Sequence, residues 1–152
     1  MKLISTAFKE GETIPDQFTG DGDDVSPPLR WETVPAGTKS LALICDDPDA
    51  PKGTWVHWVL FNIPPEVTRL SENVSPKEKE LPSGARQGAN SWGTIGYRGP
   101  DPPPGKPHRY YFKLYALDKT LDLGAEATNE QVEKAMEGHV LGKGELMGRF
   151  GH

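Results

Sequence analysis

Four polar side chains interrupt or end otherwise apolar segments of this sequence. Asp47 follows the apolar run 39–46, His57 stands within a run of aromatic and β-branched residues, and His108 and Tyr110 begin a third such run. A carboxylate, two imidazoles and a phenol could bind an anion, exchange protons as acid and base, or ligate a metal. We expect all four to converge in one pocket with apolar walls.

A stiff loop leads into the third run. Residues 99–107 contain five prolines and two glycines. Proline restricts the backbone and removes a hydrogen-bond donor, whereas glycine allows torsions that other residues avoid, so this composition predicts one fixed path. The loop should therefore hold His108 and Tyr110 at a defined point and form one wall of the pocket.

Strand alternation predicts which side chains share a face, because residues two apart along a strand point to the same side. On this basis His57 is expected beside Trp55 and Val59, with Val56 and Trp58 on the opposite face. A histidine would then interrupt a face of bulky side chains.

The strands that must position these residues are indicated by composition. Three segments have the apolar, β-branched and aromatic content of buried strands, namely residues 39–46, 54–63 and 109–117. Asp47 is expected just past the end of the first. Weaker strand patterns cover residues 3–8, 29–31 and 146–150, the last interrupted by Gly148.

One helix is indicated near the C-terminus. Thr128 and Gln131 have the spacing of a capping box, and apolar residues follow at helical spacing as far as Val140. Many short strands and a late helix predict an all-β fold, an antiparallel Greek-key-type β-sandwich of two sheets with one or two short helices.

Length and charge restrict the classes of function. The 152 residues fit a single domain, residues 1–152. A net charge of -5, from 17 basic and 22 acidic residues, gives no general attraction to nucleic acid. Cys45 is the only cysteine, which excludes an internal disulfide. The sequence shows no secretory leader and no membrane-spanning run, so a cytoplasmic location is expected.

Other residues near these positions have simpler interpretations. Asp49 is interpreted as a turn residue. The acidic segment 21–24 lacks the ligand spacing of a calcium loop. Packing is the expected role of all four tryptophans, Trp31, Trp55, Trp58 and Trp92.

Two separated motifs resemble the signature regions of a known family. They are Asp47-Pro48-Asp49-Ala50-Pro51 with Trp55-Val56-His57-Trp58, and Gly96-Tyr97-Arg98-Gly99-Pro100 leading to His108-Arg109-Tyr110. In this order they resemble the phosphatidylethanolamine-binding protein (PEBP) family. Segments 26–31, 34–40 and 144–151 further resemble its short prokaryotic branch, called YbhB/YbcL-like or Raf-kinase-inhibitor-like.

The resemblance implies a β-sandwich with a small anion pocket. The implied lining is Asp47, His57, Gly99, Pro100, His108 and Tyr110, with the Gly99 amide as one donor. Implied partners are a phosphate, a carboxylate or a phosphoethanolamine headgroup, and also a kinase or serine protease that the protein would inhibit. A homodimer is a further implication, and we expect neither a cofactor nor a resident metal.

Two other classes of function stay open. A hydrolase or other enzyme could use Asp47, His57 and His108 as acid and base. However, no Gly-x-Ser-x-Gly motif supplies a nucleophile, and Cys45 lies in a buried strand. The same carboxylate and imidazoles could instead ligate iron or zinc. Ligand binding is the expected function, with catalysis as the alternative.

Overall fold

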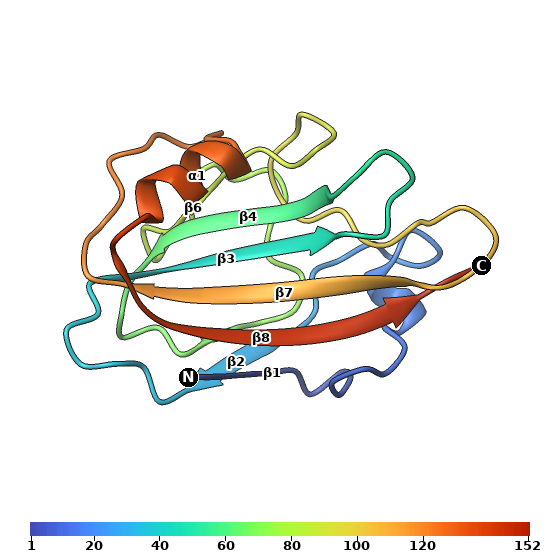
Figure 1. Ribbon diagram of the computed structural model, residues 1–152, viewed down its shortest axis with the longest axis horizontal. Helices are drawn as coiled ribbons and strands as arrows, with labels where there is room; N and C mark the ends of the chain where they lie inside the picture. Colours follow the sequence, from blue (N-terminus) through green and yellow to red (C-terminus); the bar gives the residue numbers. More distant parts are fainter.

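The computed structural model describes residues 1–152 as two antiparallel sheets and one α-helix (Figure 1). The larger sheet contains, in spatial order, β6 (Arg86–Gln87), β4 (Trp55–Ile63), β3 (Ser40–Asp47), β7 (His108–Leu117) and β8 (Val140–Phe150). The smaller sheet contains β1 (Lys2–Ile4), β2 (Leu29–Glu32) and β5 (Arg69–Leu70). The helix is α1 (Asn129–Met136), and residues Asp16–Phe18 form one turn of 3-10 helix.

The larger sheet is covered on both faces. One face packs against the smaller sheet, where Trp31 of β2 joins a core that includes Leu43 and Phe112. The other face packs under α1, where Ile44 and Val132 share a second core. All eight residues of β3 are therefore buried, which explains why its sequence is apolar on both sides. The predicted two-sheet sandwich is confirmed.

The strand order is of the Greek-key type. Along the chain β3, β4, β6 and β7 follow one another within the larger sheet, and in space they lie in the order β7-β3-β4-β6. The fourth strand thus returns beside the first, as in a Greek key. This return brings the start of β7 next to the end of β3, at the right-hand side of Figure 1.

The predicted helix is confirmed, but its apolar positions end earlier than expected. Thr128 and Gln131 form the capping box, in which the Thr128 hydroxyl accepts the Gln131 N–H at 3.2 Å and the Gln131 side chain accepts the Thr128 N–H at 2.9 Å. Gly138 takes a left-handed φ of +79° after the last turn. Val140 consequently begins β8 and is exposed. No helix has the length and apolar character to cross a membrane.

Gly148 does not interrupt the last strand, as the sequence suggested it would. β8 runs through it to Phe150, and Gly148 pairs with Tyr110 of β7. The absent side chain leaves room for neighbours, since a Cβ on Gly148 would lie 2.5 Å from Ile14 Cγ1 and 2.8 Å from Phe8 Cε2. β1 ends at Ile4 rather than at Phe8 as predicted, and the chain that follows lies beside β8, where the Gly11 N–H donates to the Met147 carbonyl oxygen.

Replacing Gly148 by alanine should therefore destabilise the fold. Overpacking of this kind costs about 1–3 kcal/mol, so we expect Gly148→Ala to lower the free energy of unfolding by that amount in urea titration. Gly124→Ala is the matched control, because a Cβ there meets nothing within 4 Å. Equal stabilities of the two variants would contradict this account of the strand.

Candidate ligand pocket

A cavity of about 280 Å³ lies at the end of the sandwich where β3 ends and β7 begins. Of the six residues predicted from the sequence, Asp47, His57, His108 and Tyr110 are among its twelve lining residues. Gly99 and Pro100 are not. The structure thus brings four of the six together, from three neighbouring strands.

His57 reaches this pocket because β4 contains a β-bulge. Cys45 pairs with Trp58 but Asp46 pairs with Val56, so His57 is an extra residue in the ladder. Val56 accordingly packs under α1 together with Val59, which corrects the predicted placement of Val56 beside Trp58. An extra residue reverses alternation locally. It moves His57 to the face that carries Trp58, which is the face of the pocket.

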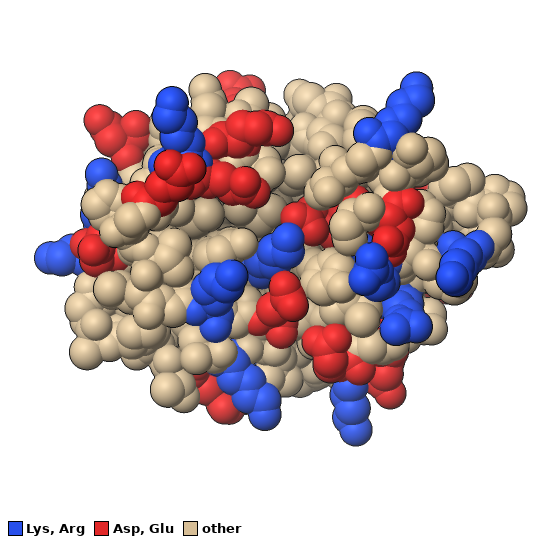
Figure 2. Space-filling view, viewed as in Figure 1, with Lys and Arg blue, Asp and Glu red and all other residues tan.

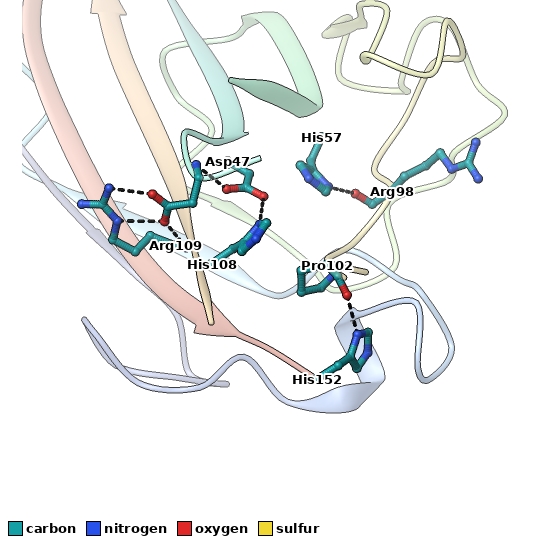
Figure 3. A network of polar contacts seen from close by, with 8 residues as sticks. Asp47, His57, Arg98, Pro102, His108, Arg109 and His152 are labelled. Carbon is teal, nitrogen blue, oxygen red and sulfur yellow. Dashed lines mark hydrogen bonds and ion pairs between the residues drawn. The ribbon is translucent and has the colours of Figure 1, made fainter. Parts of the chain in front are cut away.

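The His57 ring is buried and has a defined tautomer. It is 4% exposed, and its Nδ1 lies 2.6 Å from the carbonyl oxygen of Arg98 (Figure 3). A carbonyl only accepts, so Nδ1 carries the proton and Nε2 is left without a partner in the chain. Burial lowers the pKa of His57 below its ordinary value, and only part of this effect is offset by the Arg98 carbonyl. His57 is therefore neutral at neutral pH.

Asp47 orients the second histidine. Its Oδ2 accepts a hydrogen bond from His108 Nδ1 at 2.7 Å, and its Oδ1 accepts the Asp49 N–H at 2.8 Å (Figure 3). The carboxylate is almost fully buried and belongs to the last residue of β3 rather than to the turn after it. With Nδ1 occupied, His108 Nε2 is the ring atom available to a ligand.

Asp49 forms an ion pair that its interpretation as a turn residue missed. Arg109 donates from Nη2 to Asp49 Oδ1 at 2.8 Å and from Nε to Oδ2 at 2.9 Å. The Arg109 side chain lowers the pKa of Asp49 to about 2. The contact that closes the turn is made by Asp47, which accepts the Asp49 N–H. Asp47 thus orients His108, and Asp49 binds Arg109.

The proline-rich loop is anchored to the N-terminal part of the chain. The Gly99 N–H donates to Asp24 Oδ1 at 2.7 Å, and the Pro100 carbonyl accepts the Gly20 N–H at 2.9 Å. In this structure the Gly99 amide, predicted as a donor to the ligand, is occupied by Asp24. Pro102 and Pro103, further along the loop, line the cavity instead.

Two tryptophans that were expected only to pack stand at the pocket. Trp55 and Trp92 both line it, and each is 37% exposed. Their rings meet edge to face at 5.5 Å, and the Arg98 guanidinium lies 4.6 Å from the Trp92 ring centre. Trp31 and Trp58 are buried, as predicted. The position of Trp55 two residues before His57 was a usable signal, whereas nothing in the sequence marked Trp92.

The lining contains no activated hydroxyl or thiol nucleophile. It contains no serine, threonine or cysteine, and burial raises the pKa of the Tyr110 phenol well above its ordinary value. Cys45 is buried, and burial raises the pKa of its thiol too. Reactive nucleophiles need the opposite shift.

Asp47, His57 and His108 do not meet as a metal site. The only three side chains of this kind whose ligand atoms lie within 4.8 Å of one another are Asp21, Asp101 and His152. The His152 ring contacts both Asp21 and the Pro102 carbonyl, so it forms a further anchor of the proline-rich loop.

Comparison with known proteins gives a consistent result over nearly the whole chain. The family described as phosphatidylethanolamine-binding protein matches residues 4–151. A UPF0098 protein of Methanothermobacter thermautotrophicus is 57% identical over 150 residues, which cover 99% of this chain and 98% of that protein.

Two crystal structures are similar throughout. The structure of a PEBP homologue from Chlamydia trachomatis has a TM-score of 0.90 and 41% identity, covering 99% of this chain and 97% of that one. E. coli YbcL, described as a member of the mammalian PEBP family, has a TM-score of 0.92 and 34% identity, covering 99% and 98%.

The histidines should titrate in a fixed order. Burial lowers the pKa of His57, whereas the hydrogen bond to Asp21 raises the pKa of His152. We therefore expect NMR titration of the imidazole nitrogens to show His152 protonating first as the pH falls, and His57 in the Nδ1–H tautomer before it protonates. The reverse order would show that the His57 environment is more polar than described.

Proposed function

Since this chain belongs to the phosphatidylethanolamine-binding protein family, we propose that its pocket binds a small ligand with a phosphate group and an ammonium group, as in a phosphoethanolamine headgroup. The observation that carries the proposal is the Asp47–His108 pair, which faces neutral His57 across a mostly apolar cavity.

The two imidazoles suit the phosphate. Asp47 fixes the His108 ring through Nδ1, so a proton on Nε2 can be donated to a phosphate oxygen. His57, fixed in the same way by the Arg98 carbonyl, offers its own Nε2 when protonated. Hydrogen bonds between an imidazolium and a phosphate are charge-assisted and therefore strong. The buried Asp47 charge is already engaged and does not repel the anion unopposed.

Other lining groups suit the ammonium. Asp101 lines the cavity and is exposed, so its carboxylate is accessible to a cation. Trp55 and Trp92 add aromatic surface, and aromatic faces attract ammonium groups. A ligand with both charges uses the imidazoles and these groups, whereas a simple anion uses only the imidazoles.

Acid–base catalysis is the alternative function, and the Asp47–His108 pair is the observation in its favour. Such a pair could activate a water molecule for hydrolysis. Because no serine, threonine or cysteine lines the cavity, an esterase here would use water rather than a hydroxyl or thiol of these residues. A panel of phosphate and carboxylate esters, assayed with wild-type protein and Asp47→Asn, distinguishes the two functions, since turnover that this substitution abolishes would favour the enzyme.

Removing the His108 ring should abolish most of the binding while the fold is retained. Loss of a charge-assisted hydrogen bond costs about 1.5–3 kcal/mol, which is roughly a 10- to 100-fold weaker affinity. We expect this effect for phosphoethanolamine in His108→Ala by isothermal titration calorimetry. His139→Ala is the control, because His139 contacts Asp118 at the far side of the sheet. Wild-type affinity in a folded His108→Ala protein would place the ligand elsewhere.

Headgroup binding should strengthen as the pH falls from about 8 to about 5.5. Burial keeps His57 neutral in the free protein, so an anion that favours the charged ring must bind together with a proton. The affinity then rises with acidity, and the rise continues below the ordinary histidine range.

Ethanolamine O-sulfate is the suitable probe for this pH dependence. A phosphate monoester changes its own charge near about pH 6, whereas a sulfate ester does not. Calorimetry in buffers of different ionisation enthalpy measures the proton uptake directly. A constant affinity, with no proton taken up, would show that the imidazoles do not bind the ligand.

A further inference from the structure

A second and larger hollow, of about 530 Å³, lies on the other side of His108. His108 and Pro103 line both hollows, so they form the partition between them. Figure 3 shows Arg109 on one side of His108 and His57 on the other. The rest of its lining is charged side chains and further prolines of the loop, and no hydrophobic side chain contributes. We call this space the basic hollow.

Positive charge is concentrated there in an acidic protein. Lys106, Arg109 and Arg149 line the basic hollow, and Asp49 is the only carboxylate among them. The whole chain carries a net charge of -5. In Figure 2, Lys and Arg side chains lie near the right-hand ends of β7 and β8, with Asp and Glu side chains among them. The local excess of cations is therefore not explained by composition.

The one carboxylate does not neutralise this charge. Both oxygens of Asp49 are taken by Arg109. Arg149 and Lys106 form no ion pair and no side-chain hydrogen bond in the chain, and both are exposed. Two cations thus remain free at the surface of a hollow wide enough for a ligand group.

The register of the sheet places two of these cations side by side. Arg109 and Arg149 are directly opposite each other on β7 and β8, where Cβ atoms lie about 4.5–5.5 Å apart. Asp49 compensates the charge of Arg109, whereas Arg149 has no carboxylate partner. An anion held by Arg149 and Lys106 would supply the missing negative charge.

We infer that the basic hollow is a second anion site, adjoining the pocket of the proposed function. Its ligand group is a phosphate or a carboxylate held by Lys106 and Arg149. Because only His108 and Pro103 separate the two sites, one ligand can reach both of them. This step from the site to a ligand class rests on the proposed function. The chain selects ligands in which the phosphate of the proposed headgroup is accompanied by a second anionic group, one anion for each side of His108.

The site itself is tested with pyrophosphate, followed by the backbone amide shifts of Lys106, Arg109 and Arg149 in NMR. We expect saturable shifts, and an affinity reduced at least about tenfold in the double variant Lys106→Gln/Arg149→Gln. The matched control Lys39→Gln/Lys119→Gln removes two exposed lysines at the opposite end of β7. Shifts that do not saturate, or equal weakening in both double variants, would show only diffuse attraction by charge and overturn the site.

A measurement of stability separates a binding role from a structural one. The side chains of Lys106 and Arg149 are exposed and form no ion pair, so the fold does not depend on them. Arg149→Gln should therefore lose pyrophosphate binding without any fall in melting temperature. A lower melting temperature would mean that Arg149 supports the fold instead.

The ligand class is tested with a series of α,ω-alkane bisphosphates of increasing chain length, compared with propyl phosphate by calorimetry. We expect at least one bisphosphate to bind wild-type protein about tenfold tighter than propyl phosphate, and Lys106→Gln/Arg149→Gln to lose this advantage with unchanged affinity for propyl phosphate. No advantage at any length would refute the ligand class. Pyrophosphate shifts at Arg149 that persist in His57→Ala would support the basic hollow even where the first pocket failed to bind.

Discussion

Burial of β3 on both faces is the constraint on which the rest of the structure depends. A strand between two cores cannot carry charge along its length, because an uncompensated buried charge is very costly. Its charges are therefore confined to its last two residues, and each has a cation or imidazole as partner. Asp46 pairs with Lys113 on the helix side, while Asp47 pairs with His108 on the other. The pocket lies at the end of β3 because charged side chains are tolerated only there.

Much of this could be predicted from residue types alone. Runs of β-branched and aromatic residues located β3, β4 and β7 to within a residue at each end, since burial on both faces leaves a strong compositional signal. The capping box located α1 for a similar reason, because each of two specific side chains must accept the backbone N–H of the other residue. Asp47, His57, His108 and Tyr110 were found because each is polar where its segment is otherwise apolar.

The remaining features depend on partners far away in the sequence. Gly99 had the composition of a ligand donor, yet its amide faces Asp24, seventy-five positions earlier. Gly148 resembled a strand breaker because the filling of its space by Phe8 and Ile14 is a tertiary fact. The bulge at His57 depends on how β4 pairs with β3, and neither strand alone records that register. Trp92 stands at the cavity for a similar reason, since its ring packs against Trp55 and His57, which are far away in the sequence.

The bulge at His57 also bears on how related sequences should be compared. The bulge adds a residue that faces the pocket without changing how the rest of the strand packs. Beyond it, Trp58, Val59 and Leu60 alternate between the two cores as in a regular strand. Deleting one residue here would leave the hydrophobic pattern and the fold in place while removing an imidazole from the pocket. The overall sequence identity between two relatives would hardly differ after such a deletion. A single gap in an alignment between positions 56 and 58 is therefore more informative about ligand recognition than many substitutions elsewhere.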